Sequence, residues 1–251
     1  IKPLYYTHIN NEVIFSSELK PLIKYPGFKK SININAISSY LSYRYVIGKE
    51  SFFENVYSVL AGQVIEFSNE GKKESVYWDI PIVTAKQKKS EKEYTKEIGE
   101  LLVDSIKKRM VSDVSVGAYL SGGLDSSLIV ANMCIFGKNK PITYTIGFKE
   151  EGYSEFEFSD KVANMYQIEH KKILMKPEEY FRKLKELIRI KDGPLGVPNE
   201  VPLYVMSKEL KKDFTVVLSG EGADEIFGGY GRIFRSPFDY YRLKLNFFPF
   251  T

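Results

Sequence analysis

Short runs of alternating apolar and polar residues fill the first third of the chain. Turn signals such as Asn10-Asn11 and Asn69-Glu70-Gly71 separate them, a pattern typical of antiparallel strands. One stretch with helical spacing, Ala36–Tyr45, lies among them, and Asn35 is placed to cap its start. We predict an α+β unit over residues 1–82, with strands over Leu4–His8, Glu12–Phe15, Gln63–Phe67 and Ser75–Trp78.

A polar, lysine-rich stretch over residues 84–93 follows this unit. It has no apolar periodicity, so we interpret it as a solvated linker rather than a nucleic-acid patch. Ser90 and Glu93 have the spacing of a capping box. They predict the start of a helix that ends near Met110, with one apolar stripe. We therefore predict a second domain over residues 83–251.

Strand-type and helix-type segments alternate through most of this second domain. The strand-type segments are almost continuously apolar, which is typical of strands buried on both faces. The pattern predicts an α/β fold, a parallel sheet covered by helices on both faces. Its strands are expected at Val114–Leu120, Ile142–Phe148, Glu169–Leu174 and Phe214–Leu218, and its helices at Leu128–Phe136, Ser154–Gln167, Pro177–Lys191 and Pro202–Lys212.

Composition excludes several classes of protein. The 36 basic and 32 acidic residues leave a net charge of +4, too evenly mixed for a nucleic-acid footprint. A single cysteine, Cys134, and two histidines exclude an internal disulfide and an ordinary zinc cage. Apolar runs are far shorter than the roughly 20 residues that cross a membrane. We expect a cytoplasmic protein, because a single cysteine fits a reducing compartment. We also expect a fragment or processed chain, because the sequence starts inside a strand-type run without Met or a signal peptide.

The first chemically informative loop is Ser121-Gly122-Gly123-Leu124-Asp125-Ser126-Ser127. It follows a predicted strand and precedes a helix, so it lies at the edge of the sheet where ligands bind. Its glycines allow close approach of a phosphate, and the hydroxyls and helix N–H groups form an anion cradle. The lysine of triphosphate-binding loops is missing. Asp125 instead indicates Mg²⁺ between the loop and a polyphosphate. A phosphate-binding loop without a lysine on the terminal group favours chemistry at the α-phosphate, with pyrophosphate leaving.

The second loop, Ser219-Gly220-Glu221-Gly222-Ala223-Asp224-Glu225, follows the last predicted strand. Three acids at one sheet edge repel one another unless a metal ion or a cationic reactant relieves the repulsion. Asp224 is the natural partner of Asp125 for magnesium. Glu221, the first acid after the strand, is placed to lie nearest the reacting carbon.

The two loops together resemble a known enzyme family. Ser121–Ser127 is similar to the pyrophosphate loop of the PP-loop ATP pyrophosphatases. Val217–Tyr230 and Asp192–Lys208 resemble the glutamine-hydrolysing asparagine synthetases of the bacterial type B, whose synthetase domain has a PP-loop fold. The first residues, Ile1–Tyr6 and Phe15–Lys20, resemble the last third of a class II glutamine amidotransferase domain.

The resemblance implies a ligase that uses ATP and Mg²⁺ to convert aspartate to asparagine. Aspartate and ATP would give β-aspartyl-AMP and pyrophosphate, and ammonia from glutamine would then displace AMP. Ser121, Gly122, Gly123, Asp125, Ser126 and Ser127 would hold pyrophosphate, with Asp125 and Asp224 as magnesium ligands. Leu120 and Ile146 would contact adenosine, Ser219 and Gly220 would lie near the α-phosphate, and Glu221 would support adenylation and accept a proton from ammonia.

Two alternatives remain open at this point. A related enzyme would act on another carboxylate, such as a cell-surface sugar acid or a β-lactam precursor, because that change affects only the acceptor pocket. The chain could also be a nucleotide-binding fragment without turnover, because the family's N-terminal cysteine nucleophile and its C-terminal helical region are missing from the sequence. Asp192 is either part of loop structure or a substrate-side acid. Exposed sheet edges would allow association, in the simplest case a homodimer.

Overall fold

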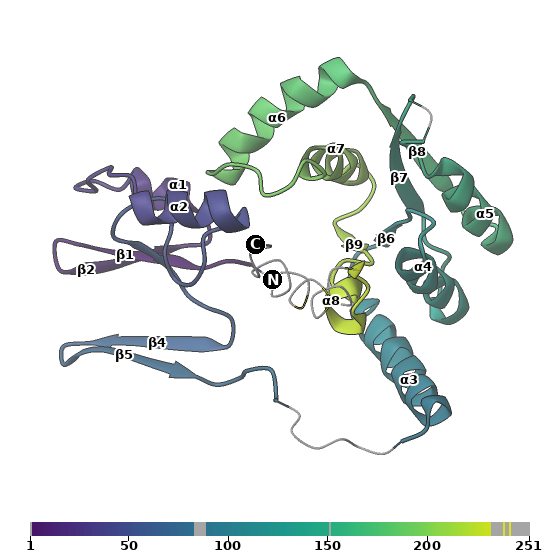
Figure 1. Ribbon diagram of the computed structural model, residues 1–251, viewed down its shortest axis with the longest axis horizontal. Coiled ribbons are helices and arrows are strands. Elements are labelled where there is room, and N and C mark those ends of the chain that lie inside the picture. The colour runs from purple at the N-terminus through teal and green to yellow at the C-terminus, as the bar shows by residue number, and fades with distance from the viewer. Residues whose placement is uncertain (1, 83–88, 151, 232–237, 239–240, 242–251) are drawn as a thin grey trace, which may run out of the picture. The chain divides into compact units, whose positions relative to one another are not determined.

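The computed structural model describes residues 2–82, 89–150, 152–231, 238 and 241. These residues divide into two compact units (Figure 1). The first contains the described residues of the ranges Ile1–Lys88 and Pro177–Tyr204, and the second contains those of Lys89–Lys176 and Val205–Thr251. The domain boundary predicted after residue 82 adjoins residues 83–88, which lie outside the described residues, and stays a prediction.

A hairpin opens the first unit because Asn10 and Asn11 both take left-handed backbone angles, with φ of 50° and 65°. Two such residues form the tight turn that matches the twist of paired strands. β1 then pairs with β2 on one side and β3 on the other, and β4 pairs with β5 in a separate sheet. The elements are β1 (Tyr5–Ile9), β2 (Glu12–Ser16), α1 (Leu19–Ile23), α2 (Ile34–Tyr43), β3 (Val56–Ser58), β4 (Gln63–Ser68), β5 (Gly71–Val76), α6 (Pro177–Lys191) and the first half of α7 (Glu200–Leu210).

The cap of α2 differs from the prediction. Asn33, not Asn35, is the N-cap, and its side chain accepts the backbone N–H groups of Asn35 and Ala36. The helix therefore begins at Ile34, two residues before the predicted start. Asn33 is favoured because its amide also donates to the carbonyl of Ser51 at 3.2 Å, a tertiary contact that local pattern does not reveal.

The second unit is built on a four-stranded sheet of order β8-β7-β6-β9 in which all three strand pairs are parallel. The predicted α/β class with a parallel sheet is confirmed. The capping box at Ser90 and Glu93 is also present at the start of α3. The elements are α3 (Glu91–Arg109), β6 (Val116–Tyr119), α4 (Leu124–Phe136), β7 (Thr143–Phe148), α5 (Phe156–Tyr166), β8 (His170–Met175), the end of α7, β9 (Val216–Leu218) and α8 (Ala223–Phe227).

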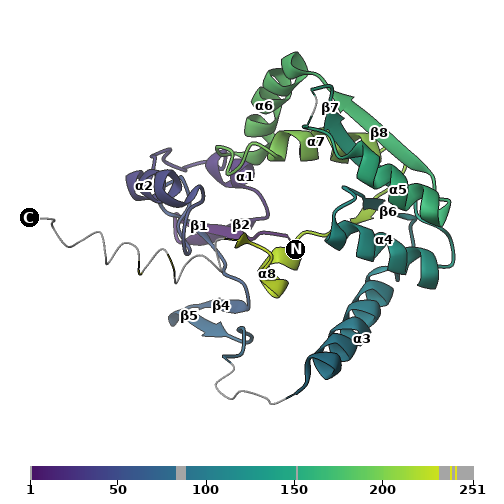
Figure 2. The same ribbon diagram turned by 45° about the vertical axis from the view of Figure 1, so that its right-hand side comes forward.

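Helices cover both faces of this sheet, as Figures 1 and 2 show. Alternate residues of a strand point to opposite faces. Ala118 and Leu120 pack in one buried cluster with residues of α3, α4 and α5. Tyr119 and Tyr144 face the other side, where Met206 and Leu210 of α7 cover them. The carboxyl ends of the strands are left for the loops that carry the predicted site.

Several short elements and boundaries were not predicted. α4 begins at Leu124 rather than Leu128, so half of the first loop is the first turn of a helix. The three-residue strand β3 and the five-residue helices α1 and α8 are too short to produce a periodic pattern. In the described part of the chain, every helix is too short or too polar to cross a bilayer.

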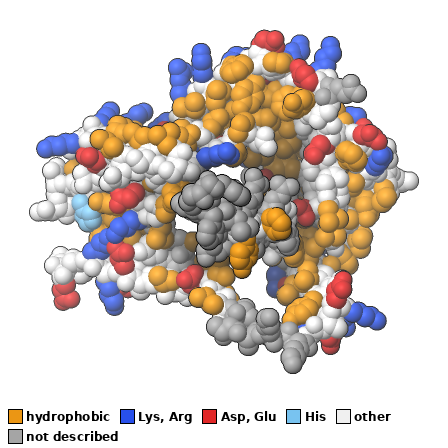
Figure 3. Space-filling model, viewed as in Figure 1, with side chains coloured by type: hydrophobic (Ala, Val, Ile, Leu, Met, Phe, Trp, Pro, Cys, Tyr) orange, Lys and Arg blue, Asp and Glu red, His pale blue; other side chains and the backbone are white. Residues whose placement is uncertain are grey.

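Apolar side chains gather over α6 on the face of the molecule drawn in Figure 3. Phe181 is 65% exposed, Ile188 41% and Ile190 52%. Leu187 is the buried residue of the same helix. α6 thus presents apolar residues to solvent as well as to its own unit.

Candidate functional site

The two predicted loops meet at one edge of the parallel sheet. β6 and β9 are hydrogen-bonded neighbours, with Ala118 opposite Leu218, so Ser121 and Ser219 leave the sheet from the same edge. A Cβ atom added to Gly220 would lie 3.1 Å from the Cβ of Asp125 and 3.1 Å from the backbone nitrogen of Ser126. The absence of a side chain at Gly220 is what allows this approach.

The first loop is a tight turn that leads directly into α4. Gly123 is the N-cap, and Asp125 lies in the first helical turn. The first N–H groups of a helix have no partner within the helix, and the helix dipole adds positive potential there. Gly122 has a φ of 86°, and a Cβ on it would lie 2.5 Å from atoms of Phe158 and Ser159. Only glycine fits this turn, which α5 presses against.

The serine hydroxyls of the loop have two different tasks. The Ser126 hydroxyl accepts the backbone N–H of Ser121 at 3.2 Å, lies 2.9 Å from the Ser121 hydroxyl and donates to the carbonyl of Gly123. The Ser121 hydroxyl accepts the N–H of Gly123 at 3.2 Å. These two side chains therefore hold the loop in shape.

Ser127 differs, because its hydroxyl oxygen is buried and finds no hydrogen-bond partner among the described residues. A buried hydroxyl without a partner costs free energy, on the order of 1–3 kcal/mol. Such a group one turn into α4 fits a site that an anion completes. This observation supports a phosphate at the start of α4.

Leu120 directly follows β6, and Ile146 lies inside the neighbouring strand β7, two residues before its end. Leu120 is 1% exposed and its side chain belongs to the core. Its N–H donates to the carbonyl of Tyr144 at 2.9 Å, and its carbonyl accepts the hydroxyl of Thr145. Contact of Leu120 with a nucleotide is thus limited to its carbonyl oxygen, and any apolar contact is left to the part-buried Ile146.

The second loop turns sharply into α8. Gly222 has a φ of 91°, and the N–H of Ala223 donates to the carbonyl of Gly220 at 3.2 Å. The Ser219 hydroxyl accepts the N–H of Glu221 at 3.4 Å. The Glu221 side chain is exposed, and Asp224 is half-buried at the start of α8.

No three acidic, histidine or cysteine side chains gather into a metal cluster in the part of the chain that the structure describes. Magnesium does not require one, because it is commonly held by one or two carboxylates together with substrate phosphates and water. The donor set of Asp125 and Asp224 fits that pattern. The chain's own residues are therefore compatible with a magnesium ion that arrives with a polyphosphate.

Thr145 contacts the chain next to the first loop, and the sequence analysis did not single it out. Its hydroxyl holds the carbonyl of Leu120 at the point where the chain leaves β6. Tyr119 was missed as well, and its hydroxyl lies 2.7 Å from that of Ser207 on α7. The signal for Thr145 was a second polar residue, after Thr143, inside an otherwise apolar buried strand.

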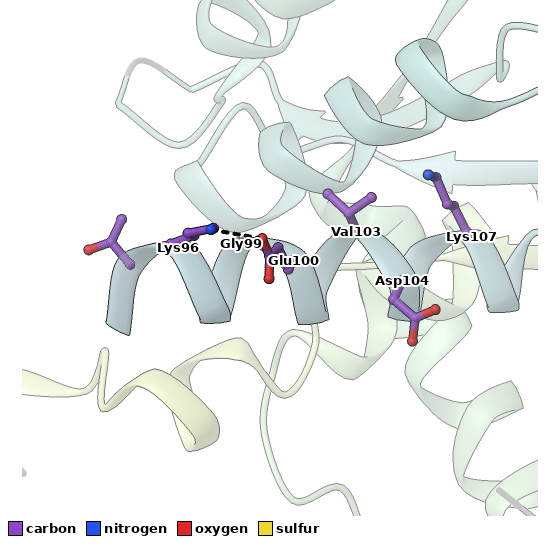
Figure 4. A pocket seen from close by; sticks show the side chains of 7 residues that line it. Lys96, Gly99, Glu100, Val103, Asp104 and Lys107 are labelled. Atoms are coloured by element: carbon purple, nitrogen blue, oxygen red, sulfur yellow. Dashed lines mark ion pairs between the residues drawn. The ribbon is translucent and has the colours of Figure 1, made fainter. Parts of the chain in front are cut away.

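Two further features lie apart from the loops. Asp192 forms an ion pair with Lys20 at 2.5 Å, which supports its interpretation as loop structure. A cavity of about 490 Å³ runs along one side of α3 (Figure 4), where Lys96 and Glu100 form an ion pair at 3.9 Å. None of the predicted site residues lines this cavity; its lining residues are Thr95, Lys96, Gly99, Glu100, Val103, Asp104 and Lys107.

Both parts of the chain are similar in sequence to known protein families. Residues 97–245 match the family described as asparagine synthase, and residues 1–78 match the glutamine amidotransferase domain. The chain is 37% identical to asparagine synthetase [glutamine-hydrolyzing] 1 of Bacillus subtilis, over 94% of this chain and 37% of that protein. It is 29% identical to asparagine synthetase [glutamine-hydrolyzing] 3 of the same organism, over 92% of this chain and 40% of that protein.

The chain therefore spans less than half the length of these relatives. Among solved structures, the glutamine-dependent NAD+ synthetase from Acinetobacter baumannii in complex with adenosine diphosphate superposes with a TM-score of 0.41. That superposition covers 72% of this chain and 33% of the other, with 18% sequence identity.

Proposed function

The chain belongs to the asparagine synthase family, and we propose that it carries the nucleotide-binding part of an enzyme that converts aspartate to asparagine with ATP. The observation that carries the proposal is the approach of Gly220 to Asp125 and Ser126. It supports one site assembled from two loops that are far apart in the sequence. In this reaction the aspartate side chain attacks the α-phosphate, pyrophosphate leaves, and ammonia then displaces AMP from β-aspartyl-AMP.

We assign the phosphate-binding role to the first loop and the start of α4. The unpaired N–H groups of the first helical turn and the Ser127 hydroxyl would bind the leaving pyrophosphate, while Gly122 and Gly123 leave room for it. Ser121 and Ser126 would keep these donors in place. Asp125 and Asp224 would hold Mg²⁺, which, when bound, neutralises charge that develops on the pyrophosphate.

The second loop would act at the reacting end of the nucleotide. Ser219 and Gly220 would lie beside the α-phosphate. Glu221, which is exposed, would accept a proton from the attacking ammonia. The carbonyl of Leu120 and the side chain of Ile146 would contact adenosine. Donors fixed before the reaction stabilise the charge of the transition state without reorganising.

We further propose that glutamine supplies the ammonia in the longer protein. The match of residues 1–78 to a glutamine amidotransferase domain supports this source. Glutamine would be hydrolysed in that domain before the ammonia reaches the synthetase site. Ammonium salt bypasses that step, so the synthetase reaction can be tested separately.

The test is product analysis of the protein with Mg·ATP, aspartate and ammonium salt, resolved by chromatography. We expect AMP, pyrophosphate and asparagine, with AMP formed only when aspartate is present. The Asp125→Asn variant, which removes one proposed magnesium ligand, should lose most of this activity. ADP and phosphate as products would refute the proposal, and AMP formed only with a different acid would identify another acceptor.

A further inference from the structure

The start of α5 lies directly against the first loop at Gly122. A Cβ atom on Gly122 would lie 2.5 Å from the Cβ of Phe158 and 2.5 Å from the backbone nitrogen of Ser159. Both of these residues belong to the beginning of α5. Backbone atoms take part in this contact, so rotation of a flexible side chain cannot relieve it. The place of this part of α5 therefore limits where Gly122 can lie.

The start of α5 depends on tertiary contacts for its place. Among the described residues, the side chain of its N-cap residue, Glu155, makes no capping hydrogen bond, so the first turn has less local support. Ser159 is fully buried, and its hydroxyl donates to the carbonyl of Phe156 at 3.1 Å. The same hydroxyl lies 3.1 Å from Nε2 of His170 on β8. This contact joins the start of the helix to the sheet.

His170 lies between two hydroxyl groups that belong to different elements. Its side chain is only 6% exposed. Nδ1 lies 2.9 Å from the hydroxyl of Thr143 on β7, and Nε2 lies 3.1 Å from that of Ser159 on α5. Thr143 is also the register partner of His170 in the parallel sheet. One side of the imidazole is thus fixed by the sheet, and the other side sets the distance to α5.

The other contacts of α5 are less suited to this task. Lys172 on β8 forms an ion pair with Asp160 at 2.9 Å, with side chains 44% and 39% exposed, and exposed ion pairs contribute little. Ala163 packs in the core of the unit, but apolar contacts are not directional. A small shift of the helix start is therefore opposed mainly by the buried contact between Ser159 and His170.

We propose that Ser159 is a positioning residue for the first loop, held in place by His170. The inference rests on the proposed nucleotide-binding function. All the residues concerned belong to the second unit. The backbone of Ser159 sets how closely α5 approaches Gly122, and Gly122 carries the loop whose N–H groups would face the phosphate. A binding site needs its groups within about 0.5 Å of the productive geometry, so a small shift of α5 weakens Mg·ATP binding.

The test compares variants of the full chain that break one side of the imidazole at a time. Ser159→Ala removes the hydroxyl on α5. The matched control, Thr143→Val, removes the hydroxyl on β7 and keeps the shape of the side chain. Both hydroxyls are on fully buried residues, so both variants should lose a similar free energy of unfolding. Calorimetric titration measures Mg·ATP affinity, and hydrogen exchange without nucleotide measures the order of residues 121–127.

We expect Ser159→Ala to bind Mg·ATP roughly three- to tenfold more weakly and to exchange faster over 121–127. Thr143→Val should stay within about twofold of the unmodified protein in affinity, with unchanged exchange over this segment. Loss of stability alone would affect the two variants equally, so the difference between them reports on position.

Two substitutions of His170 separate its two contacts. His170→Gln places an amide near the position of Nε2, and His170→Asn places one near that of Nδ1. The glutamine should keep the contact with Ser159 and bind Mg·ATP within about twofold of the unmodified protein. The asparagine should lose that contact and resemble Ser159→Ala.

Three results would overturn the inference. The first is unchanged affinity in Ser159→Ala, the second is an equal loss of affinity in Thr143→Val, and the third is equal affinity in the two His170 variants. An unmodified protein that does not bind Mg·ATP would refute the proposed function instead, and exchange without nucleotide then still decides whether Ser159 positions the loop. Thermal melting identifies a variant that fails to fold, and His170→Asn then takes the place of Ser159→Ala.

Discussion

Replacing Ser126 and Ser127 separately with alanine should affect different properties, although the residues are neighbours. Ser126→Ala should lower the stability of the protein, and Ser127→Ala should weaken Mg·ATP binding. Ser126→Ala removes the acceptor of the Ser121 N–H and a donor to the carbonyl of Gly123. Ser126 is only 8% exposed, so water has little access to the hydrogen bonds that its hydroxyl makes. The carbonyl of Gly123 still accepts the N–H of Ser127 at 3.0 Å, so the Ser121 N–H is the group that loses its partner. An unsatisfied buried group costs about 1–3 kcal/mol, and we expect the free energy of unfolding to fall by about 2 kcal/mol in the absence of nucleotide.

Ser127→Ala removes a hydroxyl that has no partner among the described residues. No hydrogen bond of the nucleotide-free protein is lost, so its stability should stay unchanged or rise by up to about 1 kcal/mol. A hydrogen bond to a charged phosphate contributes about 1.5–3 kcal/mol. Mg·ATP should therefore bind about ten- to a hundredfold more weakly.

Two measurements on each variant separate these effects, namely urea unfolding without nucleotide and calorimetric titration with Mg·ATP. A Ser127→Ala protein that binds Mg·ATP as tightly as the unmodified chain would show that this hydroxyl does not face the ligand. Equal loss of unfolding free energy in both variants would show that the two hydroxyls are equivalent. Either result would refute the division of tasks argued from the hydrogen bonds.

Three other changes have defined expectations. Gly220→Ala places a Cβ 3.1 Å from that of Asp125, so the loops must separate by a few tenths of an ångström, and AMP formation should slow by about three- to tenfold; an unchanged rate contradicts their close approach. Gly99→Ala, in an exposed part of α3 with nothing within 4 Å, should raise the melting temperature by about 2–4 °C and leave AMP formation unchanged. Burial lowers the pKa of His170, with Asp160 partly opposing the shift. The unfolded chain then binds the proton more readily, so stability is complete above the unfolded value of about 6.5 and falls as the pH drops below it. In the His170→Gln variant the melting temperature should depend less on pH over this range. An unaltered pH dependence of the melting temperature would show that other groups cause it.

The order of strands and helices in the second unit could be predicted because each depends on a local pattern. Apolar runs gave all four strands of the sheet, and Ser90 with Glu93 gave the start of α3. The predicted ends of helices were less accurate where a side chain also bonds to residues far away in the sequence. Asn33 caps α2 in place of Asn35 because it also bonds Ser51, and no local rule contains that contact.

The pairing of the two loops could also be predicted, because parallel strands end at one edge. The tasks of individual serines could not. The two residues are both serines, yet the Ser126 hydroxyl bonds to the loop and the Ser127 hydroxyl has no partner among the described residues. That difference depends on where α4 begins, and the sequence pattern placed the start of this helix four residues too late. The contribution of Thr145 could not be predicted either, because its hydrogen bond to Leu120 connects β7 to the end of β6, and a local sequence pattern does not contain such a contact.

Contacts from three parts of the structure hold the first loop, Ser121–Ser127, in shape, which matters for its proposed role. Thr145 fixes the carbonyl that precedes the loop, Ser126 closes the turn, and α5 presses on Gly122. A loop that must present N–H groups to a leaving pyrophosphate gains most when those groups are already aligned, because no reorganisation is then needed during the reaction. The second loop is different in kind, since Glu221 is exposed and its turn leads into a helix of only five residues. We therefore expect nucleotide binding to leave the first loop nearly unchanged and to order the second, so that the acid meets the reacting carbon only after ATP is in place.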